Sequence, residues 1–105
     1  MRFLLTHKSE QAPDESLFAE MGAFIEELTA SGTLLATGGM EPGGSLISFS
    51  GGELTVTDGP FTEAKEAAGG FALIDVPSRD AAIELARRFF ALIGEGEGRI
   101  RQVHG

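Results

Sequence analysis

The residues best suited to chemistry lie in one short stretch, residues 58–66, which reads Asp-Gly-Pro-Phe-Thr-Glu-Ala-Lys-Glu. Asp58 is followed at once by Gly-Pro, a pair that forms tight turns and would hold the Asp58 carboxylate at a fixed place. A carboxylate held in this way can act as an acid–base group or orient a ligand. The alternative is that Asp58 only bonds to nearby backbone, as an Asx turn or a helix cap.

Lys65 follows Asp58 by seven positions and is its nearest cation in the sequence. A turn at Gly59-Pro60 and a short helix from about Thr62 would bring the ammonium group back toward the carboxylate. There Lys65 could stabilise negative charge on a substrate, as the catalytic partner of Asp58. If Lys65 is instead a solvated helix residue, the pair contributes little.

The chain contains two histidines and no cysteine, tyrosine or tryptophan, so thiol and phenol side-chain chemistry is excluded. His7 lies near the end of the first predicted strand. Because an imidazole titrates near neutral pH, His7 is the third catalytic candidate, as a general base. The alternative is an ordinary surface histidine. His104 lies beside the last residue, where chain ends fray, and no role is expected for it.

Three further residues complete the predicted site as ligand-binding residues: Glu66, Phe61 and Met21. Glu66 could instead bond to backbone or to Lys65, and Phe61 could be a hydrophobic plug that holds its loop against the sheet. Met21 belongs to the apolar stripe of a predicted helix. No ligand spacing typical of a metal site occurs, so neither a metal nor a cofactor is predicted.

Composition limits the classes of function. The 105 residues are expected to form one domain, residues 1–105, with a single core. The formal net charge of −8 would repel phosphate backbones, which argues against nucleic-acid binding. No apolar run approaches the roughly 20 residues of a membrane span. The start of the chain is too soon polar for a signal peptide, so we expect a cytoplasmic protein.

Hydrophobic spacing predicts two helices and six strands. The first helix should begin near Asp14 and end at Gly32, and the second should be capped by Ser78 and end near Gly94. Gly51-Gly52 predicts a tight hairpin turn, and residues 94–98 read as a flexible acidic turn. The strands are expected over residues 2–6, 33–37, 45–49, 53–57, 70–76 and 99–103.

This order, with two β-α-β units and a hairpin between them, predicts an α+β fold. The expected architecture is ferredoxin-like βαββαβ with an inserted β-hairpin, a single antiparallel sheet carrying two helices on one face. The first strand and the strand over residues 70–76 are apolar on both faces, whereas two helices cover only one. We therefore expect a homodimer in which a second copy covers the other face.

Residues 58–66, followed by Gly70-Phe71, resemble the signature of the DGPF-domain family, which belongs to the YCII-related proteins. The similarity extends over nearly the whole chain and includes Met21-Gly22, Gly38-Gly39-Met40, and residues 49–52 and 94–98. The resemblance implies the same ferredoxin-like fold and the pairing of two copies into a dimeric α+β barrel.

The resemblance also implies a site. Relatives in the wider group carry a His and an Asp proposed as a catalytic pair; the motif match assigns the Asp to Asp58 but does not assign the His. Phe24 stands where a Tyr is common in the DGPF family, and Ile25, Leu46 and Ser48 replace polar or basic residues. A pocket lined by these positions would be more apolar than in those relatives.

Two functions remain open from the sequence. The first is a small dimeric protein that binds a small organic molecule near the 58–66 loop and catalyses proton transfer or a hydrolytic step, with Asp58 as acid–base and Lys65 as stabiliser. The second is a non-catalytic binding or regulatory module, since DGPF relatives are often encoded beside sigma factors. Fold similarity alone does not choose between an enzyme and a binding module.

Overall fold

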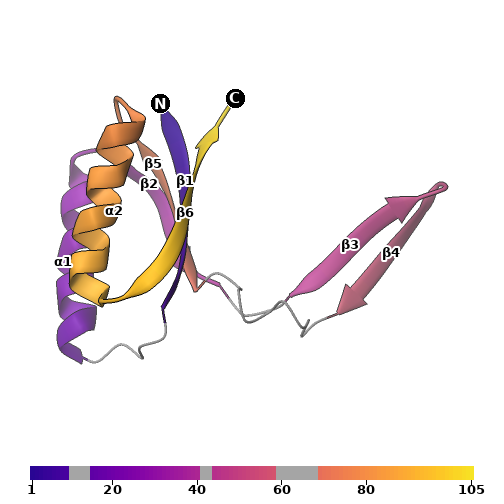
Figure 1. Cartoon of the computed structure of the whole chain (residues 1–105), viewed down its shortest axis with the longest axis horizontal. Coiled ribbons are helices and arrows are strands. Elements are labelled where there is room, and N and C mark those ends of the chain that lie inside the picture. The colour runs from indigo at the N-terminus through magenta and orange to yellow at the C-terminus, as the bar shows by residue number, and fades with distance from the viewer. Residues whose placement is uncertain (10–14, 41–43, 59–68) are drawn as a thin grey trace.

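The computed structural model describes residues 1–9, 15–40, 44–58 and 69–105, and the predicted short helix in the 58–66 loop lies outside them. The described part of the chain forms two helices and six strands (Figure 1). In chain order they are β1 (Arg2–Ser9), α1 (Glu15–Ala30), β2 (Leu34–Gly39), β3 (Ser45–Ser50), β4 (Glu53–Asp58), β5 (Gly70–Asp75), α2 (Arg79–Ile93) and β6 (Gly96–Val103).

Four of the strands form the main sheet, in the order β2-β5-β1-β6. Every neighbouring pair in this sheet is antiparallel. Both helices lie on one face of the sheet, and the other face carries no helix (Figure 1). With the hairpin set aside, this is the strand order of a ferredoxin-like fold, which confirms the predicted α+β class.

The core lies between the helices and the main sheet. Phe3 on β1 is opposite Ile74 on β5, and each side chain is only 2% exposed. Leu28 from α1 and Ala82 from α2 are also buried against this pair. Because successive side chains of a strand point to opposite faces, Leu5 and His7 lie on the same helix-facing side as Phe3.

The helix ends follow the predicted capping residues. Ser78 Oγ accepts a hydrogen bond from the Ala81 amide at 3.1 Å, which is an N-cap for α2. At the end of α1, Gly32 has φ of 78°, and the Thr33 amide donates to the Leu28 carbonyl at 3.0 Å. These features form a Schellman motif, in which glycine takes the left-handed position at lowest cost.

The predicted hairpin is confirmed as a separate two-stranded sheet of β3 and β4. Gly51 and Gly52 both have positive φ, 60° and 81°, as a type I′ turn requires. We call residues 44–58 the arm, because they stand away from the rest of the molecule, which we call the body (Figure 1).

The predicted flexible turn over residues 94–98 is wrong in its second half. β6 already begins at Gly96 and pairs with β1 as far back as Ser9, so both strands are longer than predicted. The reason is tertiary: a Cβ atom at Gly96 would lie only 2.6 Å from the Lys8 carbonyl oxygen, and one at Gly98 only 2.7 Å from that of Thr6. Glycine is a poor strand former, but here only glycine permits such close pairing.

Candidate functional site

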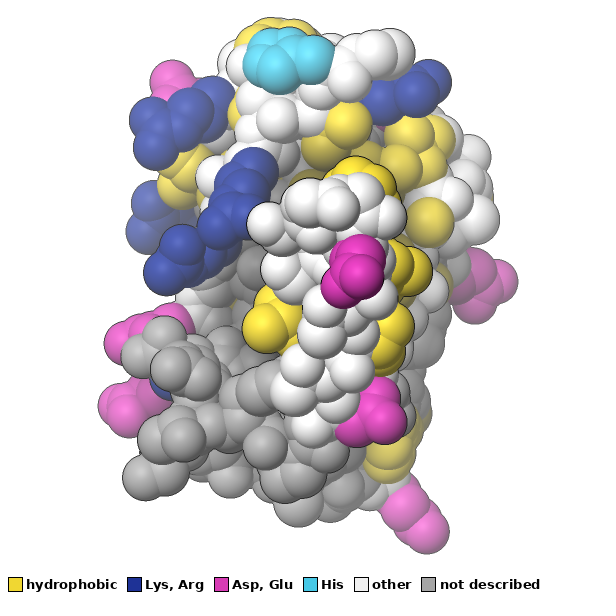
Figure 2. Space-filling view, turned by 90° about the vertical axis from the view of Figure 1, so that its right-hand side faces the viewer, with side chains coloured by type: hydrophobic (Ala, Val, Ile, Leu, Met, Phe, Trp, Pro, Cys, Tyr) yellow, Lys and Arg dark blue, Asp and Glu magenta, His cyan; other side chains and the backbone are white. Residues whose placement is uncertain are grey.

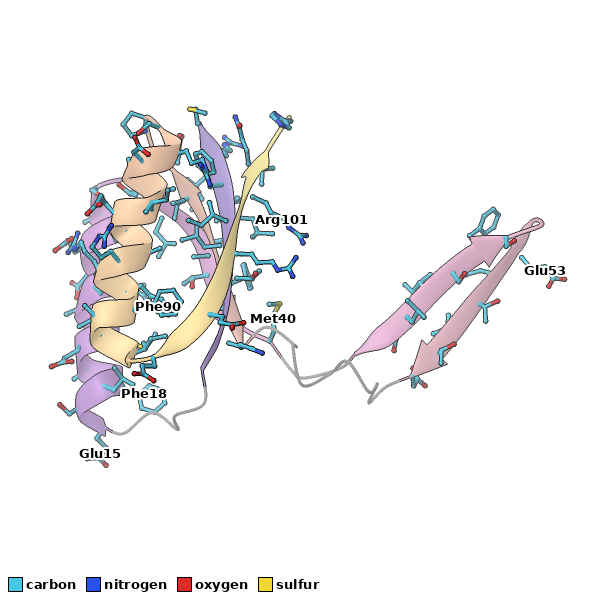
Figure 3. The ribbon with its side chains drawn as sticks, viewed as in Figure 1. Glu15, Phe18, Met40, Glu53, Phe90 and Arg101 are labelled. Carbon is cyan, nitrogen blue, oxygen red and sulfur yellow. The ribbon has the colours of Figure 1, made fainter. Side chains whose placement is uncertain are left out.

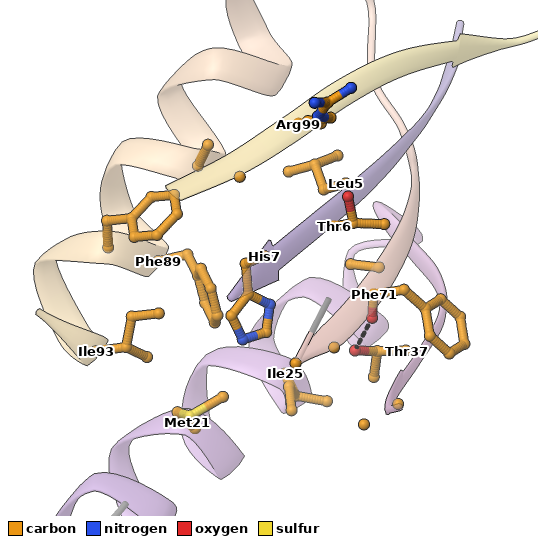
Figure 4. A pocket seen from close by; sticks show the side chains of 18 of the residues that line it. Leu5, Thr6, His7, Met21, Ile25, Thr37, Phe71, Phe89, Ile93 and Arg99 are labelled. Carbon is orange, nitrogen blue, oxygen red and sulfur yellow. Dashed lines mark hydrogen bonds between the residues drawn. The ribbon is translucent and has the colours of Figure 1, made fainter. Parts of the chain in front are cut away.

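A pocket of about 770 Å³ opens where β1 and β5 run out beneath the two helices (Figure 4). Its volume falls in the range of about 300–1,000 Å³ typical of small-molecule sites. Its walls are mainly apolar, and both helices and the main sheet contribute to them. The larger apolar lining residues are Leu5, Leu17, Phe18, Met21, Ile25, Phe71, Phe89, Phe90, Ile93 and Ile100.

His7 lies in this pocket on the helix-facing side of β1 (Figure 4). Its ring meets the Phe89 ring edge-on, with centroids 4.7 Å apart and planes at 73°. Burial lowers the pKa of His7 from its ordinary value of 6.5, because the apolar surroundings disfavour the charged imidazolium. His7 is therefore neutral at pH 7 and able to accept a proton.

The space for the His7 ring depends on glycine. On β5, Gly70 is directly opposite His7, and a Cβ atom there would lie 2.7 Å from His7 Cε1 and 3.1 Å from the Gly38 carbonyl oxygen. On β6, Gly98 is opposite His7, and its Cβ atom would lie 3.3 Å from the Phe90 ring. Both neighbouring strands thus leave the histidine unobstructed at the position where the pocket needs it.

Met21 lines the pocket from α1, one helical turn before Ile25 (Figure 4). The structure therefore brings two of the six predicted site residues, His7 and Met21, to one pocket. At the rim, Thr37 Oγ1 donates to the Phe71 carbonyl at 2.8 Å and joins β2 to β5. Besides His7, Arg99 is the only charged or titratable residue among the described lining residues.

Asp58 lies elsewhere in the described structure. It is the last residue of β4, exposed at the base of the arm, and its Oδ1 accepts a hydrogen bond from Ser45 Oγ at 2.6 Å. It is not among the described residues that line the pocket. Lys65, Glu66 and Phe61 lie outside the described residues, so the expected pairing of Asp58 with Lys65 remains a prediction.

The described residues show no metal cluster and no membrane span. Nowhere in them do three or more His, Asp or Glu side chains gather closely enough to hold a metal ion. No helix in the described part of the chain is both long and apolar enough to cross a membrane.

A family comparison agrees with this fold and with the sequence motif. The model of the YCII-related domain matches residues 1–103. The chain belongs to the YCII-related domain family. This confirms the family that the 58–66 motif predicts.

An uncharacterised protein of this kind, R00369 from Rhizobium meliloti (strain 1021), is 36% identical over 76 residues. The match covers 70% of this YCII-related chain and 61% of the R. meliloti protein, so about two fifths of that relative has no counterpart in the match. The relative is consistent with the family and names no reaction.

Among solved structures, this YCII-related domain is similar to a 5-chloro-2-hydroxyhydroquinone dehydrochlorinase from Burkholderia phenoliruptrix AC1100, determined in complex with 2,5-dihydroxybenzoquinone. The superposition covers 100% of this chain and 96% of the dehydrochlorinase, with a TM-score of 0.50 and 20% sequence identity. At this identity the similarity shows a shared fold.

Sequence reasoning missed part of the pocket of this YCII-related domain. Phe89 and Phe90 were predicted only as the apolar stripe of the second helix, yet both line the pocket. Gly70 was predicted only as a helix stop and a strand start, yet it makes room for the His7 ring. Glycines within the two strands that flank a histidine were the available signal, because glycine inside a strand often marks a close approach.

Proposed function

We propose that this YCII-related domain binds a small, mostly apolar organic molecule in the pocket and that His7 accepts a proton from it. One observation carries the proposal: a neutral imidazole is held on an otherwise apolar wall, with its pKa lowered by burial. Such a group is a poor place for a stable charge and a good place for a base that acts near neutral pH.

The chemistry of the lining sets the class of ligand. A flat ring would contact Met21 and Ile25 from α1 and the Phe89 ring from α2, and these side chains exclude water from one end of the pocket. A weakly acidic O–H on such a ring could donate its proton to an imidazole nitrogen, leaving an oxyanion on the ligand and an imidazolium on His7. The ring ligand named in the structure of the dehydrochlorinase supports this choice of class.

The proposed roles of Asp58 as a further acid–base group and of Lys65 as a stabiliser of the ligand anion would add to His7. The second candidate function is a binding module without turnover. The hydrogen bond between Ser45 and Asp58 favours this alternative, because it gives the carboxylate a structural task within the arm.

The binding step is tested with 4-nitrophenol, a ring whose O–H ionisation is visible by absorbance. We expect saturable binding to the wild type and a shift of the bound probe toward its anion. The variant His7→Gln should weaken this shift at least about tenfold, the size of a lost proton-accepting hydrogen bond. His104→Gln is the matched control and should behave as the wild type. Equal ionisation in His7→Gln and the wild type would refute the role of His7.

Turnover separates the two candidate functions. For the enzyme, a chlorinated hydroquinone offered as substrate should be converted at a rate that falls in His7→Gln while the thermal unfolding temperature holds. For the binding module, the ring should bind without conversion in either protein.

A further inference from the structure

One face of the arm is apolar and uncovered. The register places Ile47 opposite Val56 and Phe49 opposite Leu54, so the four side chains share a face. They are 66%, 57%, 72% and 61% exposed, in that order. No described element of the body packs on β3 or β4 beyond an incidental contact. Single exposed apolar residues are ordinary, but four contiguous ones mark an interaction surface.

The arm is also too small to be stable alone. An isolated two-stranded hairpin is at best marginally stable in water, and stability comes from a third strand or from packing against another surface. The body of the same chain gives the arm no such surface, since the arm projects from it (Figures 1 and 3). A covering surface must therefore come from another molecule.

The body exposes a face of matching character. On the side of the main sheet opposite the helices, Leu4 pairs with Leu73, and Phe71 lies two residues before Leu73 on β5. These side chains alternate with the helix-facing Phe3 and Ile74, so they point away from the core. We call this surface the open face. Its apolar centre has about the breadth of two neighbouring strands, as the arm has.

Charge on the open face is opposite to charge on the arm. Four of the eight Lys and Arg residues of the chain alternate onto this face from β1 and β6, against two acids, giving +2 in a chain whose net charge is −8. Figure 2 shows such basic side chains beside exposed apolar ones. The arm carries Glu53 and Asp58 and no Lys or Arg. The residues counted on the open face are Arg2, Lys8, Arg99, Arg101, Asp75 and Glu97.

We infer that the arm of each copy lies, apolar side down, on the open face of a second copy of this chain. A twofold exchange covers both arms and both open faces at once and closes, so the assembly stops at two. Opposite charges at the rim would favour this orientation over arm-on-arm pairing, in which the acids of two arms would meet. The inference is independent of the proposed function, because none of its arm residues lines the pocket.

Cross-linking tests the inference directly, because the native chain has no cysteine. Phe49→Cys on the arm and Leu73→Cys on the open face are made in chains with different tags, mixed and treated with a bismaleimide. We expect a product that contains both tags. Leu46→Cys, on the opposite side of the arm, is the control and should give much less product. A double variant that cross-links within one chain, or Phe49→Cys chains that link only to each other, would overturn the exchange.

Light scattering supplies a second readout that needs no reagent. The wild type should be a dimer at micromolar concentration, and Ile47→Ser with Phe49→Ser should raise the dissociation constant at least about 100-fold, as for central interface residues. Leu46→Ser is 57% exposed in the native side chain and faces the other way, so its dissociation constant should stay within about threefold. An unchanged far-UV spectrum of the body shows that the variants fold. A monomeric wild type, including one whose arm instead binds lipid vesicles, would overturn the inference.

Discussion

The body and the arm treat their apolar residues in opposite ways. Phe3 in the body is 2% exposed, and Phe49 in the arm is 72% exposed, although both sit in strands with a neighbour of similar size opposite them. In the body, two helices cover one face of the sheet and leave a pocket at its end. In the arm, nothing in the described chain covers either strand. The difference shows that strand pattern identifies an apolar face but does not say which molecule covers it.

Truncating each phenylalanine should give the largest contrast. Phe3→Ala leaves a cavity between sheet and helices and should lower the free energy of unfolding by about 3–5 kcal/mol. Phe49→Ala, measured at a dilution where the chain is monomeric, should lower it by less than about 0.5 kcal/mol, because it touches no core residue. Urea denaturation followed by circular dichroism compares the two. A similar cost for both would mean that the arm packs on its own body.

Gly70→Ala should have the next largest effect, because its new methyl group would lie 2.7 Å from His7 Cε1 and close to the Gly38 carbonyl oxygen. We expect a loss of about 1–3 kcal/mol in unfolding free energy, and weaker 4-nitrophenol binding because His7 must move. Gly39→Ala is the matched control, since its nearest atom, the Gly69 carbonyl oxygen, would be 3.8 Å away. Unchanged binding by Gly70→Ala would contradict the role of glycine in positioning His7.

His7 should make the stability of the body depend on pH. Its pKa is lowered in the folded state by burial, so the unfolded chain binds a proton more readily. Stability is then fully present above 6.5 and falls as the pH drops from 6.5 toward the folded pKa. His7→Gln should flatten this part of the profile, and His104→Gln should leave it as it is. A profile that His7→Gln does not alter would show that burial does not suppress protonation of His7.

The smallest effect is expected at the base of the arm. Asp58→Asn should change the unfolding free energy of the body by less than about 0.5 kcal/mol, since Asp58 is exposed and bonds to Ser45 within the arm. Turnover assays on the same variant then decide its chemical role. Loss of turnover with intact folding would support the acid–base role of Asp58, and full turnover would leave only the structural one.

Local chemistry predicted much of the fold. Ser78 and Gly32 are residues whose side chain or backbone preference itself sets a helix end, and Gly51-Gly52 dictates the hairpin turn. The start of β6 was missed because the glycines at 96 and 98 read as a turn in isolation. Their reason for being in a strand is the close approach of β1, which is a property of tertiary structure.

The site was predictable only where strand alternation reached it. His7 follows Phe3 and Leu5 at a period of two, so a helix-covered β1 places it on the pocket side. The place of Asp58 depends instead on the direction in which the arm leaves the body, which no local pattern fixes. The room that Gly70 leaves for the imidazole depends on the register between β1 and β5, which is equally non-local.

The most direct test of the central claim, a ligand that gives its proton to His7 in the pocket, is a nuclear magnetic resonance titration of the two histidine rings with 4-nitrophenol. We expect the His7 ring signals to move to their protonated positions as the probe binds, with the Met21 methyl signal shifting alongside and the His104 ring unchanged. Saturable binding that leaves the His7 signals at their neutral positions would contradict the account.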